Sequence, residues 1–355
     1  MNANIRRRRE PLWQMFFCFL SAAVILASLW VWYRSKAAED ILNQAIQNTV
    51  ISAEPAQEDR KQTPILIHLR NADELSLAYA YYDDLAQNQT IPEGAHAVLS
   101  RDLSGKPGPG ELLINNQTSY RPDAASLLSI AVSLTQDTIP ENGDPVILIL
   151  HTHGTECYRS AAGLWYTDDE SAFRTQDTQK NMIAIGEVMR QVFEENGLPT
   201  VHCTVMHDME SYNDSYTLAA QSIRAYLAKY PSIRYVFDIH RDAITDGQTG
   251  IVRCVTDVDG ESVAQVMCVV GTDEKGADHP NWTTNLALAL QLQTVLNDRC
   301  PNLARPISLR GAAYNQKYTN GSLLIEIGST GNTLEEAKKA AVLTAQALSD
   351  IIRGN

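Results

Sequence analysis

The stretch VILILHTHGTE, residues 146–156, contains the pattern on which the fold prediction depends. Its five leading apolar residues form a short continuous run, as in a strand that is buried on both faces. Apolar residues then recur at helical spacing over 178–195, so the order is strand, loop, helix. The same alternation continues to the C-terminus. It predicts an α/β domain over 141–355, with a mixed, mostly parallel sheet and flanking helices.

The remaining elements follow from the same two periodicities. We expect an antiparallel pair of strands joined through Asp259 and Gly260. The expected strands are 65–69, 146–150, 200–205, 233–239, 251–257, 263–271 and 323–327, and the expected helices are 178–195, 216–229, 282–296 and 334–352.

Three of these strands carry polar groups at or near their carboxyl ends, where open α/β sheets place their ligand sites. The first continues into HTHGTE (151–156), the second ends in DIHRD (238–242), and the third contains Glu326. Histidine nitrogen and carboxylate oxygen are ligands that suit Zn²⁺. The set therefore predicts a mononuclear metal site, to which the second strand contributes His240.

Glu326 lies between Ile325 and Ile327 in the sequence LIEIG. Removal of water from around a carboxylate disfavours its charged form and raises its pKa. We therefore expect Glu326 to serve as the general base and acid of a reaction at this edge of the sheet.

The N-terminus predicts where the protein acts. Arg6, Arg7, Arg8 and Arg9 lie in a basic tail (1–11) before an uncharged apolar run (12–33), which is about long enough to span a bilayer core as a single helix. A cleaved signal peptide is the alternative. The arginines predict a cytoplasmic N-terminus and a catalytic domain outside the cytoplasm, attached to the cell membrane by one transmembrane helix.

Between this anchor and the catalytic domain, we expect a polar stalk (34–63) and a small accessory region (64–140) whose function the sequence does not indicate. The formal net charge of −13 argues against nucleic acid as a partner, because most of the surface should repel phosphates.

Several motifs together resemble one family. They are LHTHGTECY (150–158), RTQDTQKNM (174–182), FDIHRDA (237–243), HPNW (279–282) and YNQKYTNGSLLIEIGSTGNTLEEA (314–337). With the N-terminal apolar run, they are similar in order and spacing to the stage II sporulation protein P family, over roughly 110–350. The resemblance is specific because several unrelated motifs agree.

That family is a branch of the zinc-dependent N-acetylmuramoyl-L-alanine amidases. The resemblance implies an amidase-like fold and cleavage of peptidoglycan between N-acetylmuramic acid and the L-alanine of the stem peptide, with a further endopeptidase activity on cross-links. It also implies action at the septum and the membrane that engulfs the forespore, with sporulation protein D and sporulation protein M as partners.

The resemblance also implies roles for single residues. His153 and His240 match two zinc histidines of the wider amidase motif, and Asp177, four residues before Asn181, takes the place of its glutamate ligand. An aspartate is one methylene shorter, so Glu156 and His151 remain alternatives for this ligand. The catalytic glutamate corresponds to Glu326, followed by Gly328 and Asn332.

The expected mechanism combines these positions. Zinc polarises the amide carbonyl and activates a water, Glu326 transfers the proton, and Arg241 steadies the oxyanion. The competing hypothesis is a non-catalytic wall-binding or scaffold module of the engulfment machinery. The motif of a helical HExxH peptidase and that of a GxSxG serine hydrolase are both absent from the sequence.

Overall fold

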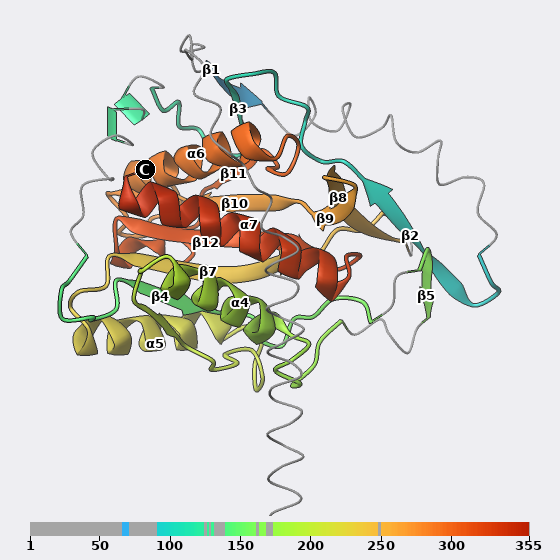
Figure 1. Ribbon diagram of the computed structural model, residues 1–355, viewed down its shortest axis with the longest axis horizontal. Coiled ribbons are helices and arrows are strands. Elements are labelled where there is room, and N and C mark those ends of the chain that lie inside the picture. Colours follow the sequence, from blue (N-terminus) through green and yellow to red (C-terminus); the bar gives the residue numbers. More distant parts are fainter. Residues whose placement is uncertain are drawn as a thin grey trace, which may run out of the picture. The chain divides into compact units, whose positions relative to one another are not determined.

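An eight-stranded sheet forms the centre of the structure, a computed structural model (Figure 1). The described residues are 66–70, 91–123, 126–127, 129–130, 139–160, 163–167, 173–247 and 250–354. They belong to one compact unit that extends from Arg60 to Asn355.

In spatial order the strands of this sheet are β1 (Leu66–Arg70), β3 (Glu111–Asn116), β11 (Ile307–Arg310), β10 (Val266–Gly271), β12 (Gly321–Ser329), β7 (Tyr235–Asp242), β4 (Ile147–Leu150) and β6 (Thr200–His202). Neighbouring strands run parallel except for β10 and β12, which are antiparallel. The sheet is therefore mixed and mostly parallel, as the sequence predicts.

Helices cover both faces of this sheet. They are α4 (Met182–Glu195), α5 (Ser215–Lys229), α6 (Trp282–Arg299) and α7 (Leu334–Arg353). Val236 packs in a core cluster with Ala219 and Ile223 of α5, whereas the ring of Phe237 stacks on Phe193 of α4. Because consecutive residues of a strand point to opposite faces, α4 and α5 lie on opposite sides of the sheet. Figure 1 shows α7, in red, across the same face as α4.

The region 64–140 is not separate from this architecture. Its strands β1 and β3 extend the main sheet next to β11. Its remaining strand, β2 (Ala95–Arg101), lies in a second, four-stranded sheet in the order β5 (Trp165–Thr167), β2, β8 (Ile251–Val258), β9 (Glu261–Ala264). The predicted boundary at residue 140 therefore does not coincide with a division of the sheets.

The predicted antiparallel pair after residue 250 is found as β8 and β9. The second of these strands is shorter than expected, because the chain changes sheets at Gln265 and continues as β10. The Gln265 side chain is buried at this junction, where it accepts a hydrogen bond from Leu103 N and donates one to Asn302 O. These bonds satisfy the polar groups that the change of sheet leaves unpaired.

The predicted fold class included a transmembrane helix, and this part needs correction. None of the helices in the described ranges is long and apolar enough to cross a membrane. The fold class is therefore corrected to its α/β part. The run 12–33, the tail 1–11 and the stalk 34–63 themselves lie outside the described residues.

The start of α7 is fixed by a buried carboxylate. Thr333 and Glu336 form a capping box, in which each side chain accepts a hydrogen bond from the other residue's backbone N–H. Arg253 on β8 donates to the same carboxylate from Nε at 2.9 Å. Burial acts to raise the pKa of Glu336, but the bonds from Arg253 and Thr333 outweigh it and lower the pKa. Glu336 thus ties α7 to the second sheet.

We expect Glu336→Gln to destabilise the protein by about 2 kcal/mol, because charge-assisted bonds to a buried carboxylate are lost. The matched control is Glu335→Gln in the same helical turn. Its side chain is 73% exposed and pairs with Lys338 on the surface, so we expect little effect. Urea unfolding of the two variants and the wild type measures the difference.

The lowered pKa of Glu336 also predicts that its contribution to stability depends on pH. A carboxyl group with a lowered pKa in the folded state stabilises the protein above its ordinary pKa of 4.5, and this contribution is lost as the pH falls through the folded value. The gap in unfolding free energy between wild type and Glu336→Gln should therefore be full at pH 7 and shrink below pH 4.5. A gap that is constant down to pH 3 would contradict this role of the charge.

Candidate active site

Two histidines meet at the carboxyl ends of neighbouring parallel strands. His153 lies in the turn after β4, and His240 lies near the end of β7. Their rings are perpendicular, with centroids 5.3 Å apart. Both residues are buried, with relative exposures of 6% and 4%. The structure thus brings together the two histidines that the sequence singles out.

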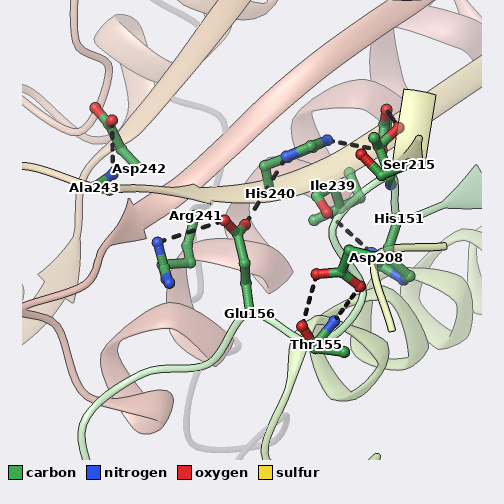
Figure 2. Close-up of polar contacts among 12 residues, drawn as sticks. His151, Thr155, Glu156, Asp208, Ser215, Ile239, His240, Arg241, Asp242 and Ala243 are labelled. Carbon is green, nitrogen blue, oxygen red and sulfur yellow. Dashed lines mark hydrogen bonds and ion pairs between the residues drawn. The ribbon is translucent and has the colours of Figure 1, made fainter. Parts of the chain in front are cut away.

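Glu156 points toward the same place (Figure 2). Its Oε2 lies 3.9 Å from His240 Nδ1, and its Oε1 lies 3.6 Å from Arg241 Nη1 and 3.6 Å from Arg174 Nη2. The carboxylate is buried, and Oε2 accepts no hydrogen bond. A buried acceptor without a donor is costly, so this atom is available to a ligand.

Asp238 orients the two strand ends. Its carboxylate accepts hydrogen bonds from Thr152 N at 2.8 Å and Thr152 Oγ1 at 2.6 Å, and it forms an ion pair with His240 Nε2 at 2.9 Å. Burial acts to lower the pKa of His240, but the Asp238 charge outweighs it and raises the pKa to about 9. The contact holds one ring nitrogen of His240 and leaves Nδ1 facing Glu156.

Zinc is the metal that this donor set suits. His153 Nδ1 and Glu156 Oε2 are buried atoms without a hydrogen bond, and imidazole nitrogen with carboxylate oxygen is a usual zinc ligand set. Within the described ranges, no three His, Cys, Asp or Glu side chains stand close enough together to hold an ion as they lie. The residues therefore fit zinc in the chemistry of their donor atoms.

Glu326 completes the group from the adjacent strand. It lies on β12 in register with His240 on β7. Its Oε2 is buried and accepts no hydrogen bond. Burial and the nearby charge of Asp242 raise the pKa of Glu326 to about 8, in the range where a carboxyl group exchanges protons near neutral pH.

Arg241 contacts the chain itself. Its Nε donates to Cys157 O and its Nη2 donates to Phe173 O, both at 3.1 Å, and only 6% of the residue is exposed. With Nη1 near Glu156, the guanidinium holds the segment that follows HTHG. These contacts make Arg241 a positioning residue, whereas the sequence suggested direct stabilisation of an oxyanion.

The structure places Asp177 apart from this group. Helix α4 begins only at Met182, because Asn181 is its N-cap and accepts a hydrogen bond from Ile183 N. Asp177 therefore lies in the preceding turn, where its exposed carboxylate pairs with Lys180 at 2.9 Å. One turn still links the two residues, since Asn181 N donates to Asp177 O at 3.1 Å, but it precedes the helix and leaves the Asp177 carboxylate exposed.

His151, the other alternative ligand, is fully buried and engaged through both ring nitrogens. Its Nδ1 lies 2.9 Å from Ile239 O and its Nε2 lies 2.8 Å from His202 Nε2. Burial lowers the pKa of His151 to about 3, so it is neutral at physiological pH. Gly186 on α4 makes room for the histidine pair, since a Cβ there would lie 2.5 Å from both Nε2 atoms.

Sequence reasoning missed the groups that cover His153. The ring of Tyr212 stacks on the His153 ring at 4.3 Å between centroids, and Arg174 lies over Tyr212. Asp208 pairs with Arg174 at 2.6 Å and accepts a hydrogen bond from Thr155 N. Contacts between distant loops leave no periodic pattern in the sequence. The one signal for these residues was that Arg174 belongs to the motif RTQDTQKNM (174–182).

The solved structures that the chain resembles include two amidases of low similarity. One is the N-acetylmuramoyl-L-alanine amidase AmiC2 of Nostoc punctiforme, 13% identical, with a TM-score of 0.32 over 59% of this chain and 94% of that chain. The other is the CwlD amidase from Clostridioides difficile, solved in complex with the GerS lipoprotein, 14% identical, with a TM-score of 0.37 over 59% of this chain and 99% of that chain.

Sequence comparisons are more specific. The chain is 29% identical over 220 residues to the stage II sporulation protein P of Bacillus subtilis strain 168, covering 58% of this chain and 51% of the relative. It thus spans about half the length of this curated relative. The family model described as stage II sporulation protein P matches residues 50–349. Because this match covers most of its residues, the chain belongs to the stage II sporulation protein P family.

Proposed function

We propose that the chain is a peptidoglycan hydrolase of sporulating cells that cleaves the amide bond between N-acetylmuramic acid and the L-alanine of the stem peptide. The observation that carries this proposal is the convergence of His153, Glu156, His240 and Glu326 at one edge of the sheet. Family membership supports the link to sporulation. Cleavage of peptide cross-links by the same site is a second activity of the same chemical type.

The proposed cofactor is Zn²⁺, held by His153, Glu156 and His240. When bound, it would supply a Lewis acid that polarises the amide carbonyl and activates water. Glu156 replaces Asp177 as the proposed carboxylate ligand, because Glu156 is buried beside His240 while Asp177 is exposed beside Lys180. Asp238 orients His240 from the side opposite to Glu156.

In the proposed reaction, Glu326 moves the proton. Its carboxylate accepts a proton from the attacking water and donates it to the nitrogen of the leaving peptide. A raised pKa favours both halves of this transfer near neutral pH, because the group then both takes up and releases the proton. Arg241 and Asp208 hold the HTHGTE segment in place during the reaction.

We further propose that the chain acts on the wall outside the cytoplasm at the engulfing membrane, with proteins of the sporulation protein D and M types as partners. The alternative is a non-catalytic wall-binding or scaffold module. Mass spectrometry of muropeptides released from purified peptidoglycan separates the two. Free stem peptides that disappear with a chelator support the amidase, whereas wall binding without any release supports the scaffold.

The ligand assignment predicts zinc content. We expect His153→Ala, His240→Ala and Glu156→Gln each to lose most of the bound zinc, because each removes one of three protein ligands. Asp177→Asn is the matched control for the carboxylate and should keep stoichiometric zinc. Metal analysis of the purified variants measures this. Loss of zinc in Asp177→Asn with retention in Glu156→Gln would reverse the assignment.

Glu326→Gln separates catalysis from metal binding. We expect this variant to retain the fold, zinc and wall binding, while its rate falls by about 10² to 10⁴, because the amide cannot accept the proton. Initial rates on purified peptidoglycan, measured together with zinc content, provide the test. Full activity, or loss of the metal, would refute the role of Glu326. Glu335→Gln, a substitution of an exposed glutamate on α7, is the control and should keep both the rate and the zinc content.

A further inference from the structure

A cavity of about 320 Å³ lies next to the candidate site, and the mechanism above does not use it. Its lining includes Tyr216 from α5 and, from the segment between β11 and β12, Ala312, Ala313, Tyr314, Asn315 and Lys317. Cavities of this size hold small molecules or short pieces of a polymer. The cavity therefore has room for part of a substrate.

Tyr216 connects this cavity with the candidate site. One side of its ring meets His153 edge to face, with centroids 5.7 Å apart and an interplanar angle of 89°. Tyr216 also contacts Tyr314, with centroids 5.9 Å apart. Burial and the charge of Asp238 keep the pKa of Tyr216 well above its ordinary value, so its hydroxyl stays neutral. The Tyr216 ring therefore separates a ligand in the cavity from His153.

The lining segment that contains Tyr314 and Asn315 is bonded to the elements beside it. Tyr314 and Asn315 both have left-handed backbones, with φ of 47° and 57°, which non-glycine residues adopt only when their surroundings hold them. Asn315 Nδ2 donates to Tyr216 O at 2.7 Å. The Gln316 side chain is anchored on β10, accepting from Gly271 N at 2.8 Å. These bonds tie the segment between β11 and β12 to α5 and β10.

The chemistry of the lining selects a class of ligand. The alanine methyl groups and tyrosine rings form an apolar surface, and Lys317 adds a positive charge to it. Lys317 is exposed, and its Nζ lies 5.8 Å from the centroid of the Tyr318 ring. Across the described ranges, no carboxylate forms an ion pair with Lys317. An apolar cavity with an available ammonium group suits a small ligand that carries a carboxylate.

We propose that this cavity binds the stem peptide of peptidoglycan, with Lys317 pairing with one of the peptide's carboxylates. The inference rests on the proposed function and adds the residues that recognise the peptide side of the cleaved bond. Stem peptides combine alanine methyl groups with free carboxylates. The N-acetylated sugars of an uncleaved glycan carry no carboxylate, so the charge of Lys317 favours the peptide.

The test measures binding in full-length Glu326→Gln, which does not turn the ligand over. The probes are the tripeptide L-alanyl-γ-D-glutamyl-meso-diaminopimelate, its amidated form and a disaccharide of the glycan whose lactyl group is capped as a primary amide, so that it carries no carboxylate. We expect Lys317→Met in this background to weaken tripeptide binding about tenfold, because it removes a charge-assisted contact but keeps the aliphatic stem. The amidated tripeptide should bind both proteins equally. Calorimetric titration gives the affinities.

Lys229→Met is the matched control. Lys229 is also exposed and lies over a tyrosine, with Nζ 4.8 Å from the Tyr230 ring centroid, but it is not among the residues that line the cavity. An equal loss in Lys229→Met, an unchanged affinity in Lys317→Met, or no tripeptide binding by the parent protein would overturn the proposal. A selective loss of disaccharide binding would assign the cavity to the glycan instead.

The kinetic counterpart uses the otherwise unmodified chain. On peptidoglycan, Lys317→Met should raise KM while kcat changes little, since the lysine binds the peptide and transfers no proton. A fall in kcat alone would contradict the binding role. Tripeptide binding that depends on Lys317 in a chain without hydrolytic activity would refute the proposed function and leave the binding site standing.

Discussion

The candidate site depends on the interactions of one buried carboxylate, that of Asp238. It is 5% exposed on the central strand β7, and it reaches the turn after β4 through Thr152 and the ring of His240 on its own strand. Removal of this carboxylate would leave the Thr152 N–H and a buried imidazole without a partner, at a cost of about 1 to 3 kcal/mol for each group. The same contacts fix which nitrogen of His240 faces Glu156.

The sequence was sufficient for the central part of this fold. Val146–Leu150 and the run that includes Phe237 are continuous apolar stretches, as strands covered on both faces require, and the structure has β4 and β7 there as parallel neighbours. The structure also brings the histidines that follow those runs together. Strands were also expected near β1 and β10, but β3, β11 and the pairing of the outer half of the sheet could not be read. Strands β3 and β11 are short, and their pairing joins segments nearly 200 residues apart, which no local period encodes.

The placement of Asp177 shows a second limit of sequence reasoning. A helix expected from 178 would carry this carboxylate toward the strand ends, but the Asn181 side chain caps the helix at 182 and leaves Asp177 in a solvated turn. Glu156 takes the position beside His240 because the turn after His153 folds back, held by Asp208 and Arg241. Spacing along the chain identified the residue types, whereas loop contacts decided which carboxylate is buried.

The raised pKa values of His240 and Glu326 have different main causes, which are the charge of Asp238 for His240 and burial with the charge of Asp242 for Glu326, but they share a smaller one. For both His240 and Glu326, the negative charge of Glu156 is one of the influences that raise the pKa, and these residues share an environment from which water is largely excluded. The pKa of His240 is about 9 and that of Glu326 is about 8. Protons bound to these two groups therefore balance part of an excess of buried negative charge. A divalent cation would balance the same excess, so cation and protons compete for these groups. Glu156, the proposed carboxylate ligand, thus also adds to the proton affinity of Glu326, which burial and Asp242 raise most.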